Sequence, residues 1–434
     1  METATDRLQS AVVSRLMWRL MPFLFLLYIV AYLDRINVSF AVLQMKGQLG
    51  LSDRAYGRAA GMFFAGYFFF QLPSNLILDK VGVRRWISGL MVAWGVIGCL
   101  MIFIRGPVSF YVMRFLLGAA EAGFFPGMIL YMKRWFPASA RARAVAWFMT
   151  ANPLAGIVGS PISGALLGLH GAGFSGWQWM FLLEGVPAIV LGAIVFLTLA
   201  DTPHDAAWLG EQERAWLVDK LAAEQQSESA LTGNSFWKVL LSARIWLLSL
   251  VYFGVSTTMY GVTLWLPSVI RSLSGLSYLW TGMVAVVPFV VTTVAMILVG
   301  IHSDRTGERS WHIAVPAFLG AAALVIAGYG SSPVLVVAGI GLGLAGAESM
   351  VGPFWALATS RMTGLSAAAG IAVINSLANL GGYFGPDIIG MFRTANGGFR
   401  GGLWAIAATV TLSGATALDV GRLTGETGRH ASSG

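Results

Sequence analysis

Charged residues and cysteine are both scarce in this chain. Only 11% of its 434 residues are charged and 56% are hydrophobic, which excludes an ordinary soluble domain and indicates several membrane-spanning segments. Its one cysteine, Cys99, lies in an apolar segment, so an intramolecular disulfide is excluded. Zinc-ligand spacing, a P-loop and a nucleophile elbow with placed partners are also missing. The sequence therefore predicts no metal site, no cofactor and no enzymatic activity.

The hydrophobic residues form twelve segments of membrane-spanning length. One long polar stretch, at about 200–240, separates the sixth segment from the seventh. We therefore predict an all-α membrane protein with twelve transmembrane helices in two six-helix halves, residues 1–200 and 244–434, joined by a cytoplasmic linker at 201–243. The twelve segments cover about 20–43, 56–79, 85–104, 109–132, 143–169, 177–199, 244–270, 280–300, 312–329, 333–358, 366–391 and 401–420.

The 28 Lys and Arg residues are dispersed between these segments rather than gathered in one patch. This distribution argues against nucleic-acid binding and fits the excess of basic residues that marks cytoplasmic loops. Most of them lie on the side of the N-terminus. We therefore expect a multi-pass protein of the inner membrane, monomeric in the lipid bilayer, with both termini in the cytoplasm.

A short motif, D-[KR]-x-G-x-R, occurs twice, each time directly after a hydrophobic segment in the same place of its half. The two copies indicate an internal repeat. The glycine permits a tight turn, and an aspartate beside arginines can form a charge latch between neighbouring helices. The predicted latch residues are Asp79, Arg84, Arg85, Asp304, Arg305 and Arg309.

Two pairs of charged residues lie inside predicted spans. Asp34 and Arg35 fall near the middle of the first span, where each charge costs about 2.5–3.5 kcal/mol on insertion scales. Arg114 and Glu121 share one face of the fourth span, about two turns apart, too far for a direct salt bridge in most rotamers. These charges indicate a polar cavity inside a helix bundle, and the second pair requires partners on other helices.

Several motifs spread over almost the whole chain give it a family resemblance. They are YLDRIN (32–37), PSNL (73–76), RFLLG (114–118) with Glu121 and Gly123, GWQW (176–179) with Glu184 and Gly185, GPFW (352–355) and NSLANLGG (375–382). With the doubled loop motif, they resemble the anion:cation symporter branch of the major facilitator superfamily. The resemblance implies proton-driven uptake of organic carboxylates such as sugar acids, tartrate-like dicarboxylates or aromatic acids. It also implies alternating access between two halves around a midplane site.

A symporter of an anion and a proton requires a cation for the carboxylate and an acid that changes protonation in step. Arg35 fits the first role because a guanidinium binds a carboxylate in a bidentate fork. Asp34, its neighbour, fits the second, because an anion that occupies Arg35 releases Asp34 to take a proton. The resemblance implies that Glu121 is a second proton-carrying carboxylate and that Arg114 belongs to its network. The alternative is a set of ion pairs that only fixes helix packing.

Other polar side chains are candidates to orient the substrate, and these are Tyr32, Tyr67, Asn152, Tyr260, Asn375 and Asn379. By resemblance the first three face the cavity, although sugar-acid carriers tend to have glutamine at the position of Asn152. Asn375 and Asn379 are one helical turn apart, so one face presents two amides, which can also join helices. Trp355 is expected in the core. Glu348 and Asp387 depart from the family pattern, and their roles are left open.

Two other functions fit the same pattern. An exchanger or uniporter on this fold would not need a pH gradient. A membrane-embedded sensor would bind ligand without net flux. The prediction remains import of a small organic anion with protons, driven by the proton gradient.

Overall fold

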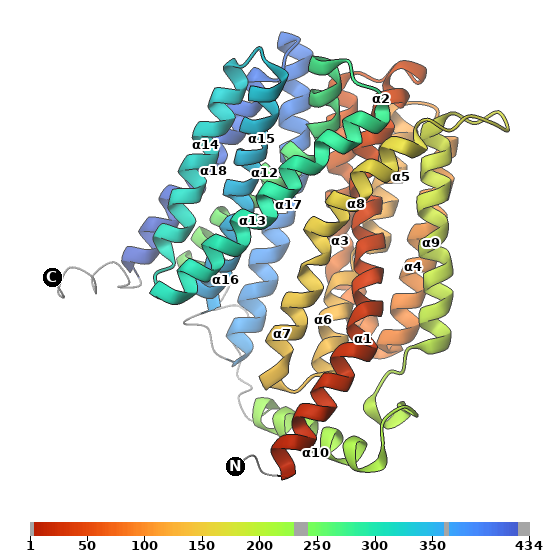
Figure 1. The fold of residues 1–434 in the computed structure, drawn as a ribbon, viewed down its shortest axis with the longest axis vertical. Coiled ribbons are helices and arrows are strands. Elements are labelled where there is room, and N and C mark those ends of the chain that lie inside the picture. Colours follow the sequence, from red (N-terminus) through yellow and green to blue (C-terminus); the bar gives the residue numbers. More distant parts are fainter. Residues whose placement is uncertain (1–3, 230–241, 360–363, 424–434) are drawn as a thin grey trace.

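The computed structural model describes residues 4–229, 242–359 and 364–423 of the chain. Within these ranges the backbone is almost entirely helical, and long helices run side by side to form one bundle (Figure 1). The first part contains α1 (Ala4–Ile36), α2 (Val38–Gln48), α3 (Asp53–Val81), α4 (Val83–Leu100), α5 (Pro107–Glu121), α6 (Phe124–Trp135), α7 (Ala138–Met149), α8 (Ala151–Leu166), α9 (Gly176–Thr198) and α10 (Glu211–Ser229). The second part contains α12 (Ala243–Ser274), α13 (Tyr278–Thr306), α14 (Ser310–Tyr329), α15 (Pro333–Ser349), α16 (Val351–Thr359), α17 (Gly364–Asn396) and α18 (Arg400–Leu423).

Most of these helices have the length and hydropathy of membrane spans. In the described ranges, 10 helical stretches meet both criteria, and each corresponds to a predicted segment. The other two predicted segments correspond to α7 with α8 and to α17. Because α7 and α8 have only 12 and 16 residues, neither is long enough alone. α17 is 33 residues long but carries asparagines and an aspartate in its middle. The all-α membrane fold is confirmed.

Several spans are interrupted near the middle of the bundle. The first span changes from α1 to α2 at Asn37, the fifth from α7 to α8 at Thr150, and the tenth from α15 to α16 at Met350. Two of the breaks precede a proline, Pro153 or Pro353, in the first turn of the next helix, where its missing N–H costs nothing. Interrupted backbone at membrane depth is tolerated where protein or a cavity surrounds it.

The two sets of spans close against each other at the end opposite the chain termini. There α3 packs on α17 so closely that a Cβ at Gly57 would collide with the backbone carbonyl of Pro386. Arg58 lies 3.7 Å from Asp387, and Arg393 lies 3.3 Å from Asp53. Among the described residues, these are the ion pairs that join the first six spans to the last six. Together with the close packing at Gly57, they connect the two sets of spans at this end of the bundle.

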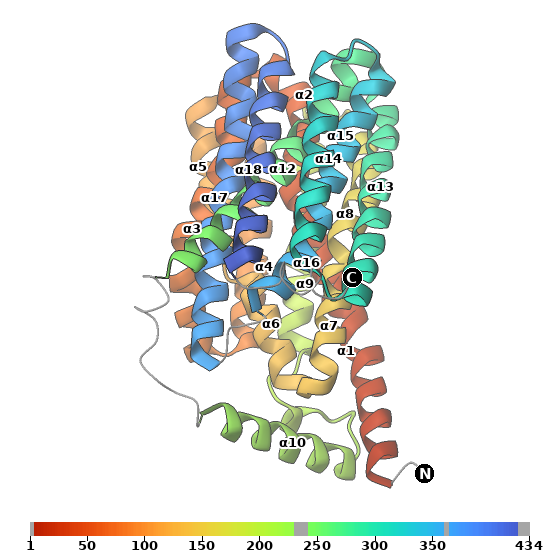
Figure 2. The same ribbon diagram turned by 90° about the vertical axis from the view of Figure 1, so that its left-hand side faces the viewer.

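The linker forms a helix across the other end of the bundle. Figure 2 shows α10 lying below the first spans, beside the N-terminal end of α1. Glu213 of α10 accepts a 2.6 Å hydrogen bond from Arg15 of α1, and Glu224 pairs with Arg141 of α7 at 3.3 Å. α10 therefore joins the ends of α1 and α7 that lie next to the termini.

Candidate functional site: a central cavity backed by buried charges

A cavity of about 310 Å³ lies in the centre of the bundle, between the two sets of six spans. That volume is in the range of small-molecule sites. Its walls come from α1, α3 and α6 to α8 on one side and from α12, α13 and α15 to α17 on the other. All seven residues predicted to contact the substrate line it: Tyr32, Arg35, Tyr67, Asn152, Tyr260, Asn375 and Asn379.

Arg35 is the basic residue of the cavity wall, and its closest partner is Glu121. The Arg35 Nε donates a 2.8 Å hydrogen bond to Glu121 Oε2, which lies in the last turn of α5 and is fully buried. The guanidinium also lies over the rings of Phe63 and Tyr67, at 5.4 and 5.1 Å from their centroids. Arg35 Nη2 has no hydrogen-bond partner in the described chain. The guanidinium is thus held at Nε by Glu121, and its Nη2 is buried beside the cavity without a hydrogen-bond partner among the described residues.

Asp34 lies behind the cavity rather than in its wall. Its Oδ1 accepts a 3.2 Å hydrogen bond from Asn37, and the carboxylate faces Gly98 of α4. The side chain is only 2% exposed, and Oδ2 has no partner among the described residues. The expected release of Asp34 by substrate on Arg35 assumed that the two side chains interact. The structure places Glu121 on Arg35 instead, because successive side chains of a helix point about 100° apart.

Arg114 is fully buried between the same helices. Its guanidinium lies 5.0 Å from the centroid of Phe63, and none of its three nitrogens has a hydrogen-bond partner in the described chain. As expected from the seven-residue spacing, Arg114 and Glu121 do not pair with each other, and Glu121 finds its partner on another span. Asp34, Arg114 and Glu121 form a layer of buried charge directly behind Arg35.

The rest of the cavity wall presents amides, hydroxyls and one acid, with Asn152 on the side of Arg35 and Asn375, Asn379 and Glu348 on the opposite side. In the described chain, Asn152, Asn375 and Asn379 form no hydrogen bond with protein groups, so their amides are available to a ligand. Glu348 lines the cavity one residue before α15 ends. Of the described lining residues, Arg35 and Glu348 are the two with full charges, and they belong to opposite halves.

An aromatic part of the wall was missed by the sequence analysis. Tyr28 lines the cavity and stacks on Phe148 of α7 with ring centroids 4.4 Å apart. Tyr252 lines it as well and stacks on Phe354 at 4.9 Å. Trp355 also lines the cavity, where core packing was expected, although it does pack on Tyr252. Tyr28 lies four residues before Tyr32, and this helical spacing was the signal that could have identified it.

The residues of the doubled loop motif lie at the end of the bundle that carries the termini. Gly82 and Gly307 have φ of 91° and 71°, the conformation for which glycine was expected. In the second copy Arg309 pairs with Asp304 at 2.6 Å, and Arg305 is exposed. In the first copy Arg85 is exposed and Arg84 pairs with Asp201 after α9, a partner that the sequence did not indicate. The Asp79 side chain lies outside the described residues.

Comparison with known proteins gives this architecture its family. Long apolar helices that surround a central cavity backed by buried charges are the architecture of many membrane transporters. Residues 24–386 match the Major Facilitator Superfamily, and the chain belongs to that superfamily, as its motifs indicated. It is 46% identical over 419 residues to a putative tartrate transporter of Agrobacterium vitis, covering 96% of this chain and 93% of that protein. It is 37% identical to the putative metabolite transport protein NicT of Pseudomonas putida, covering 94% of both chains.

A solved structure agrees in fold. A bacterial homologue of the human lysosomal transporter Spinster, in an inward-facing and occupied conformation, superposes with a TM-score of 0.78. It is 17% identical and covers 94% of this chain and 97% of its own. The family and the transporters among the relatives confirm that this protein is a transporter rather than an enzyme.

Proposed function

We propose that this protein imports a small organic carboxylate together with protons across the inner membrane. The observation that carries the proposal is the position of Arg35, a buried guanidinium in the cavity wall with Nε on Glu121 and Nη2 without a partner. A substrate carboxylate that enters the cavity can bind the guanidinium beside Glu121 once a small side-chain movement uncovers Nη2. The positive charge needed to hold an anion at membrane depth is then fixed before the substrate arrives.

Proton uptake is coupled to substrate binding because the substrate carboxylate and the Glu121 carboxylate share the Arg35 guanidinium. A second negative charge at Arg35 is repelled by the ionised Glu121, and a proton on Glu121 removes that repulsion. Asp34, in the layer behind, has an unpaired carboxylate oxygen that can take the proton onward, and the permanent charge of Arg114 stabilises the ionised carboxylates of this layer. Substrate binding and proton uptake then favour each other, which is the requirement for symport.

Alternating access requires the two ends of the bundle to open in turn. The excess of basic residues supports a cytoplasmic position for the end with the termini. The opposite, external end is closed by Arg58 with Asp387 and Asp53 with Arg393. Opening to the outside requires these pairs to separate, with the two six-helix halves 1–200 and 244–434 rocking about the cavity. The loop-motif pairs at the other end then act as the latch.

The carried anion is a small dicarboxylate, a sugar acid or an aromatic acid. The name of the Agrobacterium relative makes tartrate the first compound to test. The free amides of Asn152, Asn375 and Asn379 suit a substrate with hydroxyl groups beside its carboxylate. The Tyr and Trp side chains of the wall equally suit an aromatic ring.

The test is proton influx into proteoliposomes that contain a pH dye. Tartrate, sugar acids and aromatic acids are added one at a time, with protein-free liposomes as the control because weak acids leak protons unaided. Protein-dependent acidification with one class is expected and identifies the substrate class. Exchange of labelled substrate without acidification would show that the protein is an exchanger or a uniporter rather than a symporter. Thermal stabilisation by ligand without any flux would indicate a sensor.

A further inference from the structure

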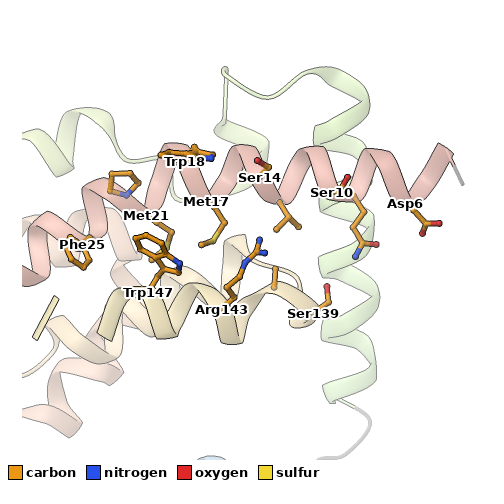
Figure 3. Close-up of a pocket in the computed structure, with 14 residues that line it drawn as sticks. Asp6, Ser10, Ser14, Met17, Trp18, Met21, Phe25, Ser139, Arg143 and Trp147 are labelled. Atoms are coloured by element: carbon orange, nitrogen blue, oxygen red, sulfur yellow. The ribbon is translucent and has the colours of Figure 1, made fainter. Parts of the chain in front are cut away.

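A second and larger cavity, unrelated to the central one, lies between α1 and α7. We name it the α1–α7 groove. Its volume is about 910 Å³. One wall is a single face of α1 between Asp6 and Phe25, on which the lining residues follow each other at alternating steps of three residues and one residue. The other wall is α7 from Ser139 to Trp147. Figure 3 shows that the two helices lie side by side, with labelled side chains of both directed into the space between them. At about 1.5 Å per residue, the α1 face is roughly 28 Å long.

The groove changes from polar to apolar along its length. At the end nearer the N-terminus its walls carry Gln9, Ser10, Ser14 and Ser139, with the carboxylate of Asp6 at the far end, about two turns of α1 from Ser14. Beyond Ser14 the α1 face is wholly apolar, from Met17 to Phe25. Because α7 runs in the same direction, its polar and apolar residues fall at the same levels as those of α1. A ligand that matches this gradient has a polar head and a hydrocarbon tail.

Arg143 lies where the polar and apolar sections meet. It is exposed, projects into the groove beside Met17 and forms no ion pair within the described part of the chain. Trp18 and Trp147 lie just beyond it, 81% and 59% exposed, at the level where tryptophan marks a membrane interface. A guanidinium at that depth is placed to meet a phosphate group, which it binds with two parallel hydrogen bonds.

We propose that the α1–α7 groove binds one anionic phospholipid, with its phosphate on Arg143 and an acyl chain along Met17, Met21 and Trp147. The serines of the polar section donate to the head group. Both walls lead towards the central cavity, because Tyr28 of α1 stacks on Phe148 of α7. A lipid in the groove therefore contacts two helices that carry the cavity wall.

The test is native mass spectrometry of the delipidated full-length protein, titrated with phosphatidylglycerol or with phosphatidylcholine. The wild type is expected to retain one phosphatidylglycerol, with an affinity at least about fivefold above that for phosphatidylcholine. Arg143→Gln should lose that preference, and Trp147→Ala should weaken both lipids. Arg19→Gln makes the same charge change at a neighbouring depth outside the groove and should leave the preference intact.

Two controls separate the lipid from other occupants. A photoreactive phosphatidylglycerol should label peptides of α1 and α7 in the wild type and not in Arg143→Gln. Equal lipid retention by wild type and Arg143→Gln, or equal loss in Arg19→Gln, would overturn the proposal. So would displacement of the lipid by inorganic phosphate at equal concentration, or by a peptide of residues 424–434, because either would show that the groove serves a different occupant.

Discussion

The two walls of the central cavity differ in how their polar groups are held. In the first half, Arg35 is tied to Glu121, and Asp34 and Arg114 lie buried behind them. In the second half, Asn375 and Asn379 face the cavity without protein hydrogen bonds. A network of buried charges at and behind one wall suits proton coupling, because moving one proton changes the electrostatics of the whole network. A wall of free amides suits substrate selection. The comparison predicts that first-half variants change coupling and second-half variants change specificity.

Arg35→Gln should have the largest effect. Removing one partner of a buried ion pair leaves Glu121 uncompensated, at a cost of about 3–5 kcal/mol, and removes the cation that binds substrate. Uptake should fall by at least about a hundredfold. Adding Glu121→Gln to Arg35→Gln should restore part of the lost stability, measured by thermal unfolding in detergent, while transport stays absent. Normal uptake by Arg35→Gln would show that the first-half wall does not hold the anion.

Asp34→Asn should separate accumulation from exchange. Asp34 does not contact Arg35, so substrate binding should survive, whereas loss of a titrating carboxylate should abolish acid-driven accumulation. Counterflow of labelled substrate at equal pH should remain within about threefold of the wild type. The matched variant is Glu184→Gln, a buried acid of the same half that accepts a hydrogen bond from Ser163. Full acid-driven accumulation by the Asp34→Asn variant would show that Asp34 does not carry the coupled proton.

Glu348→Gln should act on the substrate rather than on the proton. Glu348 is the acid of the second-half wall, and removing its charge lessens repulsion of an anion. KM for a monocarboxylate should fall by roughly three- to tenfold, the effect of about 1 kcal/mol. Protons moved per substrate, measured by pH dye and label together, should not change. A lower number of protons moved per substrate would place Glu348 in the coupling network. The two walls would then not differ in function as proposed.

Asp387→Asn should have the smallest effect. Its ion pair with Arg58 is long, at 3.7 Å, and the two side chains are 21% and 40% exposed, so it contributes less than about 1 kcal/mol. The external end should open more often, which accessibility labelling of a cysteine introduced beside Asp387 would detect. Arg393→Gln breaks the other ion pair and should act in the same direction. Unchanged labelling in the double variant would show that packing at Gly57 alone closes this end.

The sequence predicted the spans and the cavity residues because both depend on local patterns. Long apolar stretches identified the membrane helices, and charges or amides inside them identified residues such as Arg35 and Asn375. Partners across the fold were harder to foresee. The Arg35–Glu121 pair joins two spans 86 residues apart, and Arg58 meets Asp387 across the two halves. Packing of spans against each other sets such contacts, and hydropathy carries no signal for them.

Helix interruptions were missed for a related reason. The predicted segment at 143–169 contains the break at Thr150, and the segment at 333–358 contains the break at Met350. Proline and glycine at Pro153 and Gly352 were visible in the sequence, but both residues also occur in continuous membrane helices. Only the three-dimensional arrangement shows that these breaks lie at the cavity.

The central claim is that Glu121 links the substrate anion to the proton through Arg35. The most direct measurement compares wild type, Glu121→Gln and Glu184→Gln in proteoliposomes, recording proton influx and counterflow of the same labelled substrate. We predict that Glu121→Gln keeps counterflow but loses proton influx by at least about tenfold, while Glu184→Gln keeps both. Proton influx at the wild-type ratio in Glu121→Gln would contradict this account of coupling.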